Sequence, residues 1–412
     1  MYYSLQNHCI LVEGEKRGAI YDFSTGKVFS INENALLFLK ECQNKNINDI
    51  IDINSTENNS ILAFLDELSK KGLCAFYINN PNFTNPLDLI EELQIPQLEF
   101  LWLELTSACN NFCLHCYSSS SPRKLENIIS LEKWLSVIEE AKELQANAIQ
   151  LIGGEPLLYP HWQNLVEKAY NEKFEFIEIF TNATLINDSH IDFFKSNNVS
   201  IATTIYADNA LIHDKITQNP GSFFKTINAI EILLENDIPL RIASIIMKDN
   251  ENEAEKIMQF CEKLGVEVTP PDVVRPTGRG NDKDILPASY ARPLISPPFN
   301  TDEYSFYCAQ KYHSCLRGKL AITATGDVIP CIFARDMVCG NILSSKLSEI
   351  IQNKPLNKCW NTTKDKVKKC NKCEYRYACT DCRALCQNSC PNKDWFAAPV
   401  DCTYNPSTGN WE

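Results

Sequence analysis

Three cysteines with a distinctive spacing are the residues of this sequence best suited to chemistry. Cys109, Cys113 and Cys116 lie in the run 106–117, TSACNNFCLHCY, whose CxxxCxxC spacing places three thiolates on one short loop. Three thiolates can hold three irons of a four-iron, four-sulfur cluster, which leaves the fourth iron without a protein ligand. An open iron can bind and reduce a small molecule, so the spacing predicts a catalytic centre. A structural zinc site is the alternative, although zinc normally takes four ligands, often from CxxC pairs.

A glycine-containing motif is the second candidate for chemistry. Gly153, Gly154, Glu155 and Pro156 directly follow an apolar run. Glycine lets the backbone approach a ligand because no Cβ stands in the way. On its own the motif would indicate an ordinary strand-to-helix turn, and it gains meaning from its pairing with the cysteine loop.

Alternating strands and helices are expected to position both motifs. The predicted strands are Phe100–Leu105, Ala148–Ile152, Phe176–Phe180, Val199–Tyr206, Leu240–Met247 and Val266–Thr269. Helical periodicity lies between them, as in Leu131–Leu144, with Ser130 as its expected N-cap. Six such units over residues 99–270 predict an α/β fold, a partial (β/α)6 barrel. Active-site groups of such a barrel lie at the C-terminal ends of the strands, where both motifs fall.

The cysteine spacing, its place after a strand and the GGEP sequence together closely resemble the radical S-adenosylmethionine (SAM) enzymes. The resemblance implies that Cys109, Cys113 and Cys116 ligate the cluster and that SAM binds the open iron. One-electron cleavage would then give a deoxyadenosyl radical that removes hydrogen from the substrate. The resemblance also implies which residues contact SAM, with Glu155 accepting from its ammonium group, but it identifies no catalytic base. The expected SAM contacts are Gly153, Gly154, Glu155, Pro156, Thr181, Asn182, Thr203 and Thr204.

The last hundred residues are rich in cysteine, since twelve of the nineteen lie from Cys308 onward. In a reducing compartment, clustered thiols more often hold metal than form disulfides. Two zinc ribbons would fit part of the spacing. The order Cys315, ten residues, Gly326, four residues, Cys331, followed by CxxC and then five residues to the next cysteine, resembles the SPASM domain of peptide-modifying radical SAM enzymes.

The SPASM resemblance implies two auxiliary four-iron clusters, and hence three clusters in all. The first would be held by Cys308, Cys315, Cys331 and Cys382, and the second by Cys370, Cys373, Cys379 and Cys402. Between Cys379 and Cys382 this chain has two residues where three are usual. Cys386 and Cys390 are further thiols nearby, so the fourth ligand of either cluster stays open.

An N-terminal unit precedes the barrel. Strands are predicted at Cys9–Val12, Ala19–Asp22 and Lys27–Ile31, and helices at Asn34–Gln43 and Ser60–Lys71. This pattern resembles the winged-helix-like leader-recognition domain of peptide-modifying enzymes. The expected domain organisation is therefore 1–78 for this unit, 79–98 for a linker, 99–270 for the radical SAM core, 271–307 for a connection and 308–412 for the SPASM domain.

Composition narrows the class of protein. A chain of 412 residues with 44% apolar residues is long enough for two or three domains. It has no run of about 18 uncharged apolar residues and no basic stretch followed by an apolar one at its start. We therefore expect a cytoplasmic protein with no membrane partner. A net charge of −13 argues against a nucleic-acid partner.

Together these resemblances predict an enzyme that installs a thioether, joining a cysteine sulfur to carbon, in a ribosomally made precursor peptide. The peptide would bind through its leader, and an external donor such as flavodoxin or ferredoxin would supply electrons. The alternatives are carbon–carbon cross-linking, another oxidative peptide modification, or sulfatase-type formylglycine maturation. A metal-binding peptide scaffold is the non-enzymatic alternative. The sequence identifies neither the peptide, the acceptor residue, the bond position nor the oligomeric state.

Overall fold

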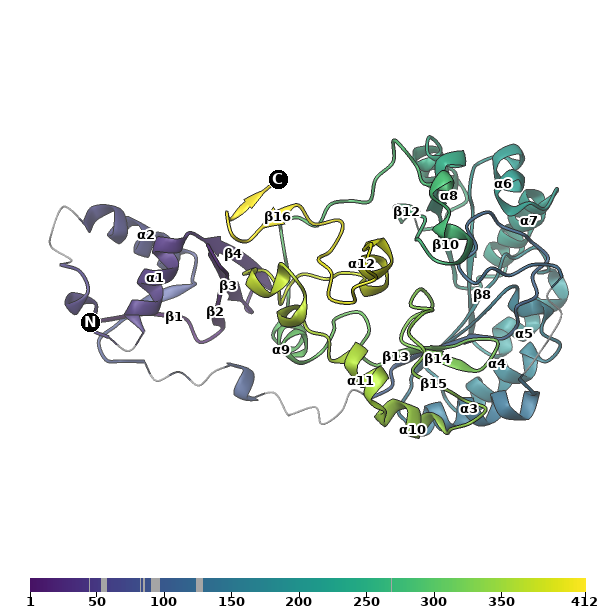
Figure 1. Ribbon diagram of the computed structural model, residues 1–412, viewed down its shortest axis with the longest axis horizontal. Coiled ribbons are helices and arrows are strands. Elements are labelled where there is room, and N and C mark those ends of the chain that lie inside the picture. Colours follow the sequence, from purple (N-terminus) through teal and green to yellow (C-terminus); the bar gives the residue numbers. More distant parts are fainter. Residues whose placement is uncertain are drawn as a thin grey trace.

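The computed structural model describes residues 1–43, 45–52, 58–81, 83, 86–89, 97–123, 129–267 and 269–412. Figure 1 shows the N-terminal unit at one end of the molecule, the barrel at the other, and the part of the cysteine-rich tail that contains α9 (Glu303–Lys311), α12 (Arg383–Ser389) and β16 (Tyr404–Asn405) between them. Among the described residues, no helix is both long and apolar enough to span a membrane.

The N-terminal unit contains the predicted strands and helices. Its elements are β1 (Tyr2–Leu5), β2 (Cys9–Glu13), β3 (Gly18–Asp22), β4 (Lys27–Ile31), α1 (Glu33–Cys42), α2 (Asn59–Lys70) and β5 (Cys74–Tyr77). Strands β2, β3 and β4 form an antiparallel sheet, while β1 and β5 form a separate antiparallel pair that the sequence did not predict. Leu36 and Leu65 bring the two helices onto the buried Ile20 of β3. The winged-helix class of this unit stays a prediction.

The barrel follows the predicted alternation of strands and helices. Its elements are β6 (Phe100–Glu104), α3 (Leu131–Glu143), β7 (Ala148–Ile152), α4 (Trp162–Asn171), β8 (Phe176–Phe180), α5 (Ile191–Ser196), β9 (Val199–Thr204), α6 (Ala210–Thr217), α7 (Ser222–Glu235), β10 (Leu240–Ala243), β11 (Ile245–Ile246), α8 (Ala254–Lys263) and β12 (Asp272–Val273). Strands β6 to β10 are parallel neighbours in chain order. Ser130 caps α3 as expected, because its hydroxyl accepts from the Lys133 N–H at 3.3 Å.

The sixth strand is not where the sequence predicted it. The described residues of Val266–Thr269 form no strand, and β12 lies at Asp272–Val273, where it pairs with β11. Gly265 adopts a φ of +76° after α8, and the Val266 N–H donates to the Cys261 carbonyl at 3.1 Å. Val266 is thus the buried apolar residue that closes the end of the helix, which accounts for its apolar character.

Three strands of the tail continue the barrel sheet, while β16 (Tyr404–Asn405) and β17 (Asn410–Trp411) form a separate antiparallel pair. The elements of the tail are α9 (Glu303–Lys311), β13 (Lys319–Ile322), β14 (Asp327–Ile329), β15 (Gly340–Asn341), α10 (Leu347–Gln352), α11 (Lys354–Trp360), α12 (Arg383–Ser389), β16 (Tyr404–Asn405) and β17 (Asn410–Trp411). Strand β13 lies parallel to β6, and β14 and β15 extend the sheet to eight strands. The cysteine-rich tail is therefore anchored next to the strand that leads into the cysteine loop.

The N-terminal unit contacts the tail through buried aromatic side chains. The ring of Phe306 in α9 lies 4.8 Å from that of Tyr21 in β3 and 5.1 Å from that of Tyr377. The Tyr21 hydroxyl donates to the Glu374 carbonyl at 2.8 Å. Since Tyr21 and Phe306 have no exposed surface, this contact fixes the β2–β3 hairpin against the loop that carries Cys373 and Cys379.

Candidate active site

The cysteine loop follows β6 and lies at the mouth of the barrel. Cys109, Cys113 and Cys116 line a cavity of about 250 Å³ together with Gly153 and Gly154. The structure thus brings the two sequence motifs to one place. Burial raises the pKa of Cys109 to about 12, and the charges of the neighbouring cysteines act in the same direction on Cys113. Three thiols around one cavity, of which Cys109 and Cys113 disfavour ionisation, suit a centre that binds them as thiolates.

Space next to the glycines is occupied by the cysteine loop. A Cβ on Gly154 would lie 2.0 Å from the Ala108 carbonyl oxygen, and one on Gly153 would lie 2.7 Å from that of Thr106. The Gly154 N–H donates to the Thr106 carbonyl at 2.7 Å, and the Glu155 N–H to that of Ala108 at 2.8 Å. The sequence predicted that glycine would make room for a ligand. In this geometry it makes room first for the loop that carries the cysteines.

Glu155 is fully buried and its carboxylate is occupied by donors of the chain. Oε1 accepts from the Thr181 hydroxyl at 2.6 Å and from the Leu157 N–H at 3.1 Å, while Oε2 accepts from the Asn182 N–H at 2.9 Å. Burial raises its pKa to about 7, and these hydrogen bonds oppose the rise. The geometry supports a role in joining two strand ends more than the predicted direct contact to SAM.

Of the polar residues predicted at the later strand ends, three line the cavity and one is buried in the core. Thr181, Asn182 and Thr204 line the cavity. Thr203 has no exposed surface, and its hydroxyl has no hydrogen-bond partner among the described residues. Because side chains alternate along a strand, Thr203 and Thr204 point to opposite faces of β9. Pro156 is buried and begins a 3-10 turn, Pro156–Leu158, beside the motif.

The connection over 271–307 supplies residues that sequence reasoning did not assign. Arg279 donates from Nε to the Cys113 carbonyl at 2.8 Å and from Nη1 to the Ser120 carbonyl at 2.9 Å, and its guanidinium lies 4.2 Å from the Phe112 ring centroid. A Cβ on Gly278 would lie 2.5 Å from the Cys116 carbonyl oxygen. The segment 275–280, RPTGRG, therefore packs against the cysteine loop and forms hydrogen bonds to it. Its two glycines and two arginines are the sequence feature from which this contact could have been predicted.

Two further residues of the barrel line the cavity although the sequence analysis did not predict them as site residues. Tyr206 and His213 line the cavity, and the Tyr206 ring lies 5.0 Å from that of His115. Burial lowers the pKa of both His115 and His213 to about 4. Both imidazoles are therefore neutral at physiological pH.

The predicted second auxiliary set is gathered at one place in the tail. Cys370, Cys373, Cys379 and Cys402 line a single cavity with Lys364 and Tyr375. Charges of these thiols act on one another, and burial raises the pKa of Cys379 to about 12. Four thiols around one cavity fit either a four-iron cluster or a zinc ion.

The predicted first auxiliary set lies against the candidate active site. Cys315, Cys331 and Cys382 lie near one another: the Cys382 charge raises the pKa of Cys315, and the charges of Cys382 and Cys315 raise the pKa of Cys331. Arg275 donates to the Cys382 sulfur at 3.3 Å and lies 4.5 Å from the Phe333 ring centroid. Because Arg275 and Phe333 also line the barrel cavity, a cluster held here would adjoin the cavity.

Cys308 has different surroundings. It lies on α9, and Arg317 donates to its sulfur at 3.1 Å. After burial, Arg317 has the largest influence on its pKa, and Glu99 and Asp302 also act on it. Cys386 lies close enough to Cys382 for the Cys382 charge to raise its pKa, so the fourth ligand of the first set stays a prediction.

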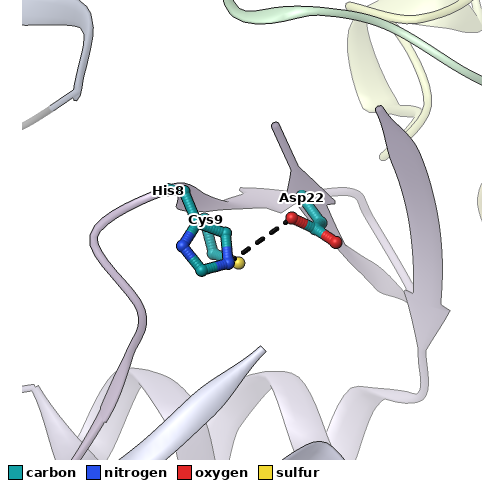
Figure 2. Close-up of side chains that lie close together, drawn as sticks. All are labelled: His8, Cys9 and Asp22. Atoms are coloured by element: carbon teal, nitrogen blue, oxygen red, sulfur yellow. Dashed lines mark ion pairs between the residues drawn. The ribbon is translucent and has the colours of Figure 1, made fainter. Parts of the chain in front are cut away.

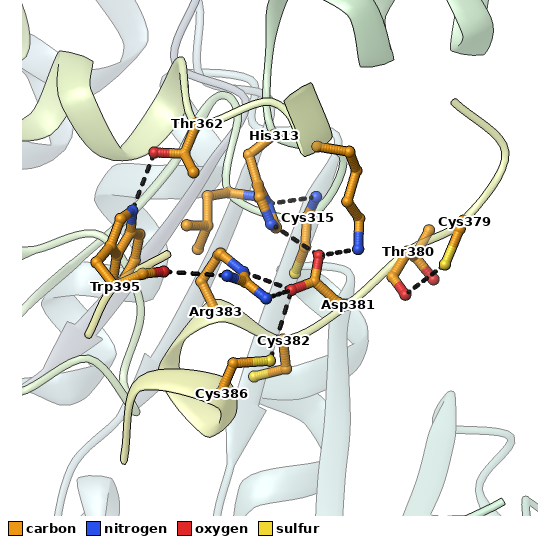
Figure 3. A network of polar contacts seen from close by, with 12 residues as sticks. His313, Cys315, Thr362, Cys379, Thr380, Asp381, Cys382, Arg383, Cys386 and Trp395 are labelled. Carbon is orange, nitrogen blue, oxygen red and sulfur yellow. Dashed lines mark hydrogen bonds and ion pairs between the residues drawn. The ribbon is translucent and has the colours of Figure 1, made fainter. Parts of the chain in front are cut away.

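A buried ion network lies beside both auxiliary sets (Figure 3). Asp381 pairs with Lys364, Arg383 and His313. Figure 3 shows Cys379 on one side of Asp381 and the sulfurs of Cys382 and Cys386 on the other. The two cysteines that flank Asp381 along the chain thus face different sets.

A smaller cluster of His8, Cys9 and Asp22 lies in the N-terminal unit (Figure 2). Asp22 accepts from the Ser24 N–H at 2.9 Å and the Ser24 hydroxyl at 2.6 Å, and from the Thr25 hydroxyl at 2.6 Å. These bonds belong to the turn between β3 and β4. Cys9 is buried in the apolar core of the unit. The turn therefore explains the position of Asp22, and the core explains that of Cys9.

Comparison with known proteins agrees with both domains. Residues 103–261 match the radical SAM superfamily, and residues 314–374 match the SPASM iron–sulfur cluster-binding domain. The AdoMet-dependent heme synthase of Methanosarcina barkeri is 25% identical over 337 residues, which are 74% of this chain and 95% of that protein.

Two proteins whose names refer to peptides, one in bacteriocin biosynthesis and one bound to a precursor peptide, are also similar to this chain. The antilisterial bacteriocin subtilosin biosynthesis protein AlbA of Bacillus subtilis is 26% identical over 271 residues, which cover 62% of this chain and 60% of AlbA. The crystal structure of Streptococcus suis SuiB bound to its precursor peptide SuiA has a TM-score of 0.56 at 15% identity and covers 97% of this chain and 99% of SuiB. At that identity the likeness to SuiB shows the fold alone.

Proposed function

This chain is a radical SAM protein with a SPASM domain, and from that premise we propose that it installs a thioether cross-link in a ribosomally synthesised precursor peptide. The observation that carries the catalytic part of the proposal is the meeting of three cysteines and two glycines around one cavity at the strand ends. Cys109, Cys113 and Cys116 would hold a four-iron cluster with SAM beside it. When bound, the cluster and SAM together supply the abstraction of a hydrogen atom from an unactivated carbon.

The residues of the chain would hold this centre in place and limit access of water. Gly153 and Gly154 allow their loop to lie directly on the cysteine loop, and Arg279 secures that loop from the other side. Thr181, Asn182 and Thr204 offer hydrogen-bonding groups to SAM in the cavity. Tyr206 and the neutral His115 give the cavity an aromatic wall, which suits an adenine ring.

The cysteine sets of the tail support the oxidative part of the reaction. Forming a carbon–sulfur bond from a carbon–hydrogen bond and a thiol releases two electrons and two protons. Hydrogen abstraction accounts for one electron, and an auxiliary cluster beside the cavity could take the other. Cys315, Cys331 and Cys382 lie next to Arg275, which lines that cavity. An external donor such as flavodoxin or ferredoxin would supply the electron for each cleavage of SAM.

Three features support a peptide as the substrate. AlbA, named for bacteriocin biosynthesis, is 26% identical over its matched part. The SuiB fold, solved with a precursor peptide bound, extends over 97% of this chain. The N-terminal unit has a three-stranded sheet whose outer strands, β2 and β4, each have one neighbour in that sheet as described, and an extended leader could add to such an edge.

Two measurements test the proposal. Anaerobically reconstituted protein should convert SAM to deoxyadenosine under reducing conditions, and Cys113→Ala should abolish that product. The matched control Cys261→Ala removes a buried thiol from an apolar cluster outside the site and should retain it. Co-expression with a cysteine-containing peptide encoded beside the gene should yield a peptide lighter by two hydrogens per cross-link, with its thiol blocked to alkylation.

A second candidate is modification of a small molecule or tetrapyrrole, because the similarity to heme synthase covers 95% of that protein. Carbon–carbon cross-linking and formylglycine formation remain alternatives on a peptide. A cross-linked peptide whose cysteines still alkylate would favour a carbon–carbon bond. Deoxyadenosine formation that is stimulated by a tetrapyrrole and unaffected by any peptide would favour the second candidate.

A further inference from the structure

The ion network in the tail contains one more positive charge than negative charges. Asp381 is the single carboxylate, and both Lys364 and Arg383 form ion pairs with it. The side chains of all three are at least 94% buried. Because these three side chains are buried, solvent screens the excess charge much less than it would at the surface.

His313 completes the network without changing this balance. Its Nδ1 accepts from the N–H groups of Cys315 and Leu316, both at 3.1 Å, which places its proton on Nε2. Nε2 lies 3.4 Å from Asp381 Oδ1 and can donate to it. The imidazole is therefore a neutral donor, and the excess positive charge belongs to Lys364 and Arg383.

The excess charge lies against the second auxiliary set. Lys364 lines the cavity that holds Cys370, Cys373, Cys379 and Cys402. Arg383, in contrast, is turned to the carbonyl oxygens of Trp395 and Ala397 at 3.0 and 2.8 Å. Lys364 is the member of the network that faces the cysteines.

We propose that Lys364 sets the reduction potential of the cluster held by Cys370, Cys373, Cys379 and Cys402. This rests on the cofactor part of the proposed function. Reduction adds one negative charge to a cluster, and a nearby buried cation stabilises the reduced form more than the oxidised form. Lys364, which lines the cavity together with Lys369 and Arg376, thereby makes this cluster easier to reduce than it would be without the lysine charge, which suits a site that accepts an electron.

The network predicts opposite results for its two partners. Lys364→Met leaves Asp381 paired with Arg383, so no buried charge loses its counter-ion. Asp381→Asn leaves Lys364 and Arg383 buried beside a neutral amide, and removing one partner of a buried ion network is strongly destabilising. Lys364→Met should fold and load iron, whereas Asp381→Asn should lose auxiliary iron.

The experiment is a redox titration of the full chain. The protein is first reconstituted anaerobically, and the titration is monitored by electron paramagnetic resonance. Alanine at Cys109, Cys113 and Cys116 leaves only the auxiliary signals. In this background, Lys364→Met should lower the reduction potential of one auxiliary cluster. The expected change is at least tenfold in the one-electron equilibrium constant, which corresponds to 59 mV. Lys364→Arg, which keeps the charge, should move it less. The matched control is Lys366→Met, which removes an exposed lysine two residues away and should leave the potentials unchanged.

The outcomes separate this inference from the proposed function. Equal potentials in Lys364→Met and the background overturn the inference and leave the cofactor assignment standing. Loss of auxiliary iron in both Lys364→Met and a second neutral variant, Lys364→Gln, which is made in the same background, assigns Lys364 a structural role and also overturns the inference. If the background itself has no auxiliary iron–sulfur signal, the cofactor part of the proposed function fails together with the inference.

Discussion

Gly154 shows how a single residue without a side chain can position a catalytic loop. A Cβ at this site would lie 2.0 Å from the Ala108 carbonyl oxygen, a distance that neither backbone can relieve without moving. We expect Gly154→Ala to displace the cysteine loop and to prevent loading of the barrel cluster, as measured by iron content and deoxyadenosine formation. Gly72→Ala is the matched control. A Cβ added at Gly72 would have no atom within 4 Å, although the residue has a φ of +72°. The Gly72→Ala variant should therefore lose about 1 kcal/mol of stability and retain its full iron content.

The carboxyl group of Glu155 gives a pH-dependent signature. Its pKa is raised from 4.5 to about 7 by burial, so the folded protein binds this proton more tightly than the unfolded chain. Its stabilising contribution is full below pH 4.5 and declines as pH rises toward 7.

Substitution of Glu155 by Gln tests this dependence. Glu155→Gln places an amide N–H group against the Thr181 hydroxyl or the Asn182 N–H and should cost about 1–3 kcal/mol. Urea unfolding of the cluster-free protein should show a decline in stability between about pH 4.5 and 7 in the wild type and a weaker decline in the variant. Parallel pH profiles for the two proteins would contradict the assignment.

At the scale of elements, the connection over 271–307 stabilises the cysteine loop of a different segment. Arg279 reaches two carbonyl oxygens of that loop and the Phe112 ring with one planar guanidinium. Lysine cannot form both hydrogen bonds in this fixed geometry. We expect Arg279→Lys to reduce iron bound at the barrel site several-fold and to lower stability by about 1–3 kcal/mol. Arg292→Lys, which alters contacts to Asp272 in the same connection, should retain the iron.

At the scale of the whole molecule, docking of the N-terminal unit depends on the aromatic contact between β3 and α9. Phe306 is fully buried between Tyr21 and Tyr377. Phe306→Ala should therefore cost about 3–5 kcal/mol and let limited proteolysis release the N-terminal unit faster. Tyr304→Ala changes an exposed ring on the same helix, and its cleavage rate should match the wild type. Equal rates for both variants would show that the docking does not depend on this contact.

Docking at this place links the N-terminal unit to the second auxiliary set. The Tyr21 hydroxyl contacts the backbone of Glu374, next to Cys373. Arg376 donates to the Glu13 carbonyl at 2.7 Å and to the Cys373 carbonyl at 2.8 Å. The loop that would hold a cluster is thus also the surface that receives the β2–β3 hairpin.

The sequence by itself determined what depends on neighbours along the chain. The CxxxCxxC spacing and the GGEP motif locate the cavity, and hydrophobic periodicity locates β6 to β9 and the helices α1, α2 and α3, because strand and helix periods are local properties. The Ser130 cap followed from one residue type at one position. The sixth strand was misplaced because Val266, an apolar residue, serves to end a helix.

Only the tertiary structure decided which distant residues meet. It joined β13 to β6, brought Arg279 onto the cysteine loop, separated Cys379 from Cys382 on two sides of Asp381, and placed Lys364 against four cysteines. No spacing along the chain encodes these contacts, because they arise between segments that pack together only after each has formed its own strands and helices. Burial then sets the charges and pKa values of these groups, and burial is a property of the folded molecule as a whole.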